Sequence, residues 1–214
     1  MILIGAKDGP PSARMSGAEY RFGEEIMQNY ARCVVSAENH RSIDRFLATN
    51  PLSKKADKLG AQIATPSCLN RGTMSFPPAL FRAALYDALY REAYGKANVL
   101  PTPDQPPLDI ANEVESQDPA DTKLYVSTRY FGDCIVRREA ASVRALLKTN
   151  IESKEETASF QALQTSMGAC LSNGNKIQFS RQMLRGLLAE ALYKLTVAAD
   201  SPRTAALTEA KPGK

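Results

Sequence analysis

The sequence predicts an all-α protein of two tandem, homologous helical units, each clamped by one disulfide, and three observations support this prediction. An ordered series of residues in the first half recurs in the second half. Apolar residues in both halves recur at helical spacing. The four cysteines fall at two matched pairs of positions, one pair in each half.

Matched segments keep their order along the two halves, at offsets that stay between 100 and 103 residues. Any insertions are therefore short, as expected for loops. The final segment of each half is the most similar. The matched segments are Cys33–Val35 with Cys134–Val136, Phe46–Asn50 with Leu146–Asn150, Ser53–Lys54 with Ser153–Lys154, Cys68–Leu69 with Cys170–Leu171, and Phe76–Arg91 with Phe179–Lys194.

The early elements of each unit are expected to be helices. Residues 24–37 have apolar residues at helical spacing, so the cysteine segments 30–37 and 131–138 are predicted as helix. Strand is the alternative for these segments, because Tyr125-Val-Ser-Thr128 favours it locally. Short helices are expected over 42–48 and 142–148, each closed by Thr-Asn.

Two further helices are expected in each unit. One follows each Ser-Lys pair, to about residues 64 and 165. The last helix of the first unit begins near Phe76, with Pro77 and Pro78 in its first turn, where proline is tolerated. In the second unit Ser180 is the predicted N-cap of the corresponding helix.

Composition divides the chain into five segments: a mobile N-terminal segment 1–21, unit 1 over 22–95, a linker 96–122, unit 2 over 123–198, and a mobile C-terminal tail 199–214. The linker contains five prolines, and one lysine against six acidic residues. This composition favours an extended, solvated connector.

The cysteines are predicted to form Cys33–Cys68 and Cys134–Cys170, within one unit each. Small helical units need such additional stabilisation. Four buried free thiols are the alternative, and pairings between the units stay open. Disulfides imply an oxidising compartment. Residues 1–8 lack the pattern of a signal peptide, so this interpretation expects an exporting segment absent from this sequence, whereas a cytoplasmic protein would keep reduced thiols.

Few residues suggest a catalytic, metal-binding or nucleic-acid-binding role. No apolar run is long enough for a transmembrane segment, and the single histidine, His40, argues against zinc sites and catalytic triads. The adjacent carboxylates Glu24–Glu25 and Glu155–Glu156 are expected to be solvated or to match helix dipoles. Acidic residues interrupt the basic ones, which argues against nucleic acid. We therefore predict no metal, no cofactor and no catalytic residues.

The block Phe131-Gly-Asp-Cys-Ile-Val-Arg-Arg138 and the helix Met183–Lys194 resemble small exported proteins of α-proteobacteria with a cysteine-containing helical repeat. The likeness covers residues 22–95 and 123–197. It implies a periplasmic setting. That family has no assigned activity, so the resemblance implies no functional residues.

Two arginines and two tyrosines recur within otherwise apolar helices and are the candidate site residues: Arg82, Tyr90, Arg185 and Tyr193. As a functional pair, arginine and tyrosine would bind an acidic ligand in a groove. As structural residues, they would tie each helix to its neighbour, and Arg82 and Arg185 variants would then lose similar stability. We favour the structural interpretation.

The predicted function is a non-enzymatic cell-envelope interaction or scaffold module, periplasmic or secreted, that recognises a protein or envelope partner on apolar faces between helices. One alternative is an enzyme of undetected type with its site between the units. The other is a cytoplasmic regulatory protein with free thiols.

Overall fold

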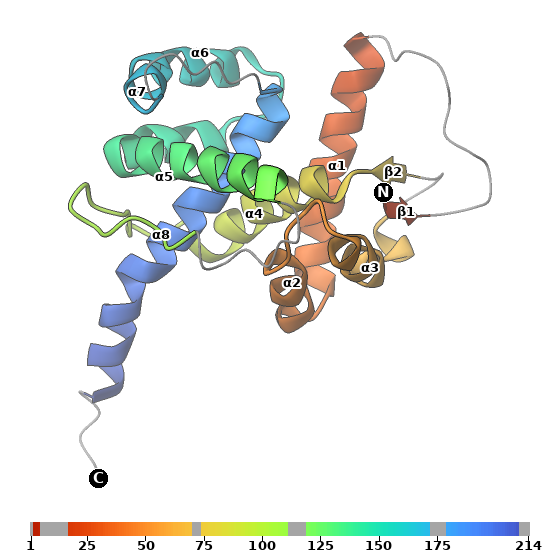
Figure 1. Ribbon diagram of the computed structural model, residues 1–214, viewed down its shortest axis with the longest axis horizontal. Coiled ribbons are helices and arrows are strands. Elements are labelled where there is room, and N and C mark those ends of the chain that lie inside the picture. Colours follow the sequence, from red (N-terminus) through yellow and green to blue (C-terminus); the bar gives the residue numbers. More distant parts are fainter. Residues whose placement is uncertain (1, 5–16, 70–73, 111–118, 172–178, 210–214) are drawn as a thin grey trace.

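The described part of the chain consists of eight α-helices, one short 3-10 helix and two short strands (Figure 1). The structure is a computed structural model that describes residues 2–4, 17–69, 74–110, 119–171 and 179–209. In order, the elements are β1 (Ile2–Ile4), α1 (Gly17–Ala37), α2 (His40–Leu47), α3 (Lys54–Ile63), η1 (Pro66–Cys68), β2 (Met74–Phe76), α4 (Pro78–Tyr94), α5 (Pro119–Lys148), α6 (Lys154–Ala162), α7 (Gln164–Ala169) and α8 (Arg181–Glu209). The all-α prediction is confirmed.

Side-chain caps start several helices where the sequence places a polar residue. Ser53 Oγ accepts the amide of Ala56 at the start of α3, and Ser153 Oγ accepts that of Glu156 at the start of α6. Ser180 Oγ accepts the amide of Met183, as predicted for the N-cap of α8. Each cap satisfies a backbone donor that has no partner within its helix.

Both cysteine segments are helical, so the alternative of strand is wrong for them. In the first half the chain breaks between α1 and α2, whereas α5 continues through the corresponding region. Glu139 nevertheless has non-helical dihedral angles within α5, which kinks the helix there. The kink therefore lies at the position that the sequence repeat matches to Glu38, next to the break after α1.

Helices α4 and α8 form the centre of the molecule (Figure 1). They pack against each other, while α1 packs against α4 and α5 packs against α8. Helix α4 is buried on most of its surface. One hydrophobic core contains residues of both halves, including Phe46 and Phe81 from the first and Leu146 and Leu188 from the second. The two halves thus share their interior.

The connector between the halves has no helix or strand over its described residues 96–110, and more than half of these residues are exposed. Several of its residues nevertheless contact the rest of the protein. Pro101 and Ile110 are buried, and Leu108 packs against the core. The Gln105 side chain donates to the carbonyl of Leu195, 2.8 Å away. Apolar residues interspersed among the prolines and acids make most of these contacts, because burying them is favourable. Residues 111–118 lie outside the described residues.

The terminal segments also contain regular structure where they are described. Ile2–Ile4 pairs antiparallel with β2 in the register Ile2 with Phe76, Leu3 with Ser75 and Ile4 with Met74. Helix α8 extends to Glu209, into the segment that was expected to be a mobile tail. Residues 5–16 and 210–214 of the predicted mobile segments lie outside the described residues.

Candidate functional site

Each half is closed by its own disulfide, as predicted. Cys33–Cys68 joins α1 to η1, and Cys134–Cys170 joins α5 to the end of α7, with Cα–Cα distances of 5.6 and 5.8 Å. All four cysteines are therefore paired, which excludes both the four free thiols and pairings between the halves.

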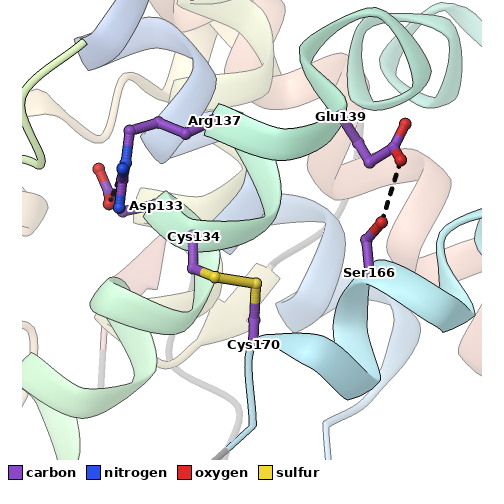
Figure 2. Close-up of a disulfide and its surroundings, with 6 residues drawn as sticks. All are labelled: Asp133, Cys134, Arg137, Glu139, Ser166 and Cys170. Atoms are coloured by element: carbon purple, nitrogen blue, oxygen red, sulfur yellow. Dashed lines mark hydrogen bonds and ion pairs between the residues drawn. A yellow bond between two sulfur atoms is a disulfide. The ribbon is translucent and has the colours of Figure 1, made fainter. Parts of the chain in front are cut away.

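A polar contact accompanies each disulfide and joins the same two parts of the chain. Figure 2 shows Glu139 of α5 accepting a hydrogen bond from Ser166 Oγ of α7 at 3.0 Å, beside Cys134–Cys170. In the first half Glu38 accepts from Thr65 Oγ1. Tyr30 also donates to the carbonyl of Thr65, and burial raises the pKa of its hydroxyl to about 12. Each disulfide thus has a hydrogen bond alongside it.

Arg185 lies at the centre of a buried network and is 1% exposed. Its Nε donates to Asp87 Oδ2 at 2.8 Å, and one terminal nitrogen donates to Glu156 Oε1 at 2.7 Å. The other terminal nitrogen donates to the carbonyls of Leu147 and Thr149, at 2.9 and 3.2 Å. A buried guanidinium is stable only when its donors are satisfied, and here two carboxylates and two carbonyls satisfy them.

Arg82 makes the corresponding contacts in the first half. Its guanidinium donates to the carbonyls of Leu47 and Thr49, which the sequence repeat matches to residues 147 and 149. It also donates to Glu190 Oε1 at 2.9 Å. The same carboxylate pairs with Arg129 and lies 3.3 Å from Lys194 Nζ. Arg82 therefore shares its acidic partner with two other cations.

The two arginines exchange partners between the halves. Arg82 of α4 binds Glu190 of α8, and Arg185 of α8 binds Asp87 of α4. Arg82 matches Arg185 in the sequence repeat, and Asp87 matches Glu190. The contacts are therefore reciprocal, and each arginine links the carbonyls of its own half to a carboxylate of the other.

The close approach of α4 and α8 depends on a glycine. A Cβ atom added at Gly186 would lie 2.0 Å from the Cβ and 2.6 Å from the Cα of Ala83. Ala83 is the position matched to Gly186. The two helices are thus in close backbone contact at matched residues, which follow Arg82 and Arg185 directly in sequence.

Gly186→Ala is expected to lower the free energy of unfolding by about 2 kcal/mol, because the added methyl group must push two packed helices apart. An alanine in an open helical position would instead stabilise by up to about 1 kcal/mol. Gly168 in α7 is the matched control, since a Cβ there meets nothing within 4 Å. Urea unfolding should show opposite signs for Gly186→Ala and Gly168→Ala; equal effects would contradict the described crossing.

The two predicted tyrosines lie along a row of rings on the central helices. Tyr193 contacts Tyr86 and Tyr94, with ring centroids 5.9 and 6.2 Å apart, and Tyr94 contacts Tyr90 at 6.0 Å. Burial raises the pKa of both Tyr90 and Tyr193. Tyr90 is buried, and its hydroxyl has no hydrogen-bond partner among the described residues. The contacts described above for the four candidates all lie within the protein, and binding of an acidic ligand by them stays a prediction.

Two of the four carboxylates are buried, which is contrary to the expectation that they are solvated, although Glu156 lies in the first turn of α6, as expected for a charge that matches the helix dipole. Glu24 is 3% exposed, and Glu156 is 2% exposed beside Arg185. Glu156 also accepts the amide of Glu152 through Oε2, at 2.7 Å. The Ser153-x-x-Glu156 spacing is a capping-box pattern, a signal that could have identified Glu156 as structural. No comparable pattern marks Glu24. Their neighbours Glu25 and Glu155 are exposed, as expected.

A very small cavity lies between the connector and the second half. It has a volume of about 10 Å³ and is lined by residues of the connector, α5 and α8, including Ile110, Arg129 and Glu190. This volume is about that of one water probe sphere. It leaves no room for an organic substrate at that point.

Two larger recesses open on the outer surface. The first, about 500 Å³, lies between α2 and α3 and is lined by Arg45, Lys55 and Lys58 together with Ala48, Leu59 and Gln62. The second, about 310 Å³, is lined by α6, α7, Phe179 and the start of α8. We call it the α6–α8 groove. Its apolar side chains are Phe160, Met167, Phe179 and Leu184, and its polar ones are Thr157, Gln161, Gln164 and Arg181.

Comparison with known protein families, with curated proteins and with solved structures finds no match to this chain. Among the described residues, no helix is both long enough and apolar enough to span a membrane.

Proposed function

We propose that the protein is a non-enzymatic interaction or scaffold module of the cell envelope, built from two copies of one disulfide-clamped helical unit. The two copies share one core and act as a single rigid body. Partners bind in recesses on its outer surface rather than between the copies.

Matched contacts support the proposal of two copies. Four kinds of contact occur at positions that match in the sequence repeat. They are the disulfides, the glutamate–hydroxyl bonds, the serine caps and the arginine–carbonyl bonds. Thr49 and Thr149 each donate Oγ1 to the carbonyl three residues earlier, at 2.6 and 2.7 Å. Independent origins would not place so many equivalent bonds in the same order.

The single observation that carries the non-enzymatic proposal is the composition of the junction between the copies. Its buried charged groups hold one another: Arg185 with Asp87 and Glu156, and Arg82 and Arg129 with Glu190. Groups held in this way stabilise a fold and have little freedom to exchange protons with a substrate. An enzyme with its site at this junction is therefore the weaker alternative.

The disulfides support an oxidising compartment, because such bonds are rare in the reducing cytosol. The resemblance to exported α-proteobacterial repeat proteins points the same way. We therefore place the module in the periplasm or outside the cell, in preference to a cytoplasmic regulatory role with free thiols.

Trapping the thiols in cells of the native host tests this proposal. Cells are quenched in acid, alkylated and fractionated; we expect no alkylated cysteine and recovery with the periplasmic fraction. In the same cells a photo-crosslinking residue at Gln164, in the α6–α8 groove, should give a discrete adduct, whereas one at the exposed Arg138 of α5 should not. Alkylated cysteines in a cytosolic fraction, or identical adducts from both positions, would contradict the proposal.

A further inference from the structure

The two halves differ in what covers the region between their third helix and the segment before their last helix. In the first half β1 pairs with β2 and lies against α3. This half therefore adds Ile2-Leu-Ile4, an extended aliphatic segment, to the edge formed by β2. In Figure 1 the β1–β2 pair and the α6–α7 pair lie on different sides of the central helices.

The corresponding region of the second half is the α6–α8 groove. Helix α6 matches α3, and Phe179 matches Phe76, the last residue of β2. The groove lies between α6 and Phe179, and in the first half β1 contacts both of the matched elements, α3 and β2. None of the described segments of the chain fills it.

Exposure of the matched apolar residues reflects this difference. Phe76 and Phe81 of the first half are 3% and 0% exposed. Their counterparts Phe179 and Leu184 are only partly buried and line the groove. Apolar side chains that are buried in one half are thus partly exposed in the other, where a further chain can cover them.

The rest of the lining fits an extended peptide. Phe160 and Met167 extend the apolar surface, whereas Gln161, Gln164 and Thr157 supply polar groups. Arg181 lies across one side, where it donates to Thr157 Oγ1 at 3.0 Å. An apolar surface with polar groups around it is typical of grooves that bind extended segments through alternate side chains.

We propose that the α6–α8 groove is a docking site for an extended aliphatic segment of a partner protein, which binds there as Ile2–Ile4 binds in the first half. This inference rests on the proposed relation between the two halves. It specifies the partner by its chemistry: successive aliphatic residues, no proline, and a backbone able to adopt a strand.

A labelled peptide tests the proposal, with Lys-Ile-Leu-Ile-Gly-Lys as the probe and Lys-Ile-Pro-Ile-Gly-Lys as its control. The full chain should bind one probe peptide and should not bind the control. Leu184→Lys should weaken binding about tenfold or more, because it places a charge in the apolar lining. Leu52→Lys is the matched control; Leu52 is 58% exposed, lies in the first half, and its variant should keep the affinity.

A photoreactive version of the probe locates the binding site without any substitution, so the test does not depend on whether a variant folds. Its adduct on the unmodified chain should map to residues lining the groove. An adduct elsewhere, absence of binding, or dimers of the full chain that the probe dissociates would each overturn the proposal, the last because a second copy would then be the occupant.

The number of bound peptides separates this inference from the proposed relation between the halves. The triple variant Ile2→Gly, Leu3→Ser, Ile4→Gly should open the first-half position and raise the stoichiometry from one to two. One peptide on both proteins would support the groove and contradict the equivalence of the halves. None on the full chain and one on the triple variant would overturn the groove and support the equivalence.

Discussion

Replacing Arg185 by alanine is expected to destabilise the protein by about 3 to 5 kcal/mol. The change leaves two carboxylates buried without their main partner, and removing one member of a buried ion pair costs about this much. Glu156 is the more affected of the two, because Asp87 keeps Arg91, whose Nε lies 2.7 Å from Asp87 Oδ1. The carbonyls of residues 147 and 149 lose a donor as well.

Arg82→Ala should lower the free energy of unfolding by less, about 2 kcal/mol, which is the decrease expected when the hydrogen bonds of one charged group are lost. Glu190 retains Arg129 and Lys194 as partners, so its charge stays compensated. This expectation differs from the equal effects that the sequence predicts for a purely structural pair. The physical reason is that the first half has Ala56 where the second has Glu156.

Urea unfolding of the two variants, with Arg138→Ala as an exposed control, measures these effects. The control should stay within about 0.5 kcal/mol of the unchanged protein. A neutral Arg185→Ala would contradict the structural role, and a loss from Arg82→Ala greater than that from Arg185→Ala would contradict the partner assignment described above.

Removal of either disulfide is the other change with a large expected effect. Each bond closes a loop of about 35 residues, and in the chain-entropy account such a bond stabilises by about 3 to 4 kcal/mol. We expect this loss for Cys33→Ser with Cys68→Ser, and separately for Cys134→Ser with Cys170→Ser. Paired replacements avoid a single reactive thiol that could form new bonds.

Peptide mapping and thermal unfolding check this prediction together. The unchanged protein should give the linked peptides 33–68 and 134–170 and no free thiol before reduction. Reductant should lower its melting temperature. The same treatment should not change the melting temperature of a variant in which all four cysteines are replaced. Equal melting temperatures with and without reductant, with the bonds shown to be broken, would contradict the stabilising role.

Local patterns made much of the fold predictable. The ordered recurrence of segments predicted the cysteine pairs, because a disulfide repeated in two similar units must join equivalent positions. Helical spacing, the Ser-Lys pairs that begin at Ser53 and Ser153, and the N-cap Ser180 predicted where several helices lie. These features depend on neighbours within a few residues, or within one unit, and a single sequence displays them directly.

Contacts between the halves were not predictable in the same way. Arg82 and Arg185 could be recognised as structural candidates, but their acidic partners belong to the opposite half, about 100 residues away in sequence. The burial of Ile110 was not predictable for a related reason. The connector has the composition of a solvated chain, and Ile110 is buried where α5 and α8 provide a surface for it.

Scanning calorimetry of the oxidised, full-length protein is the most direct test of the central claim that the two units form one rigid body through reciprocal ion pairs and a shared core. We expect a single transition whose calorimetric enthalpy equals its van't Hoff enthalpy, as for one cooperative unit. Two separate transitions, each with about half of the total enthalpy, would show that the units unfold independently and would contradict it.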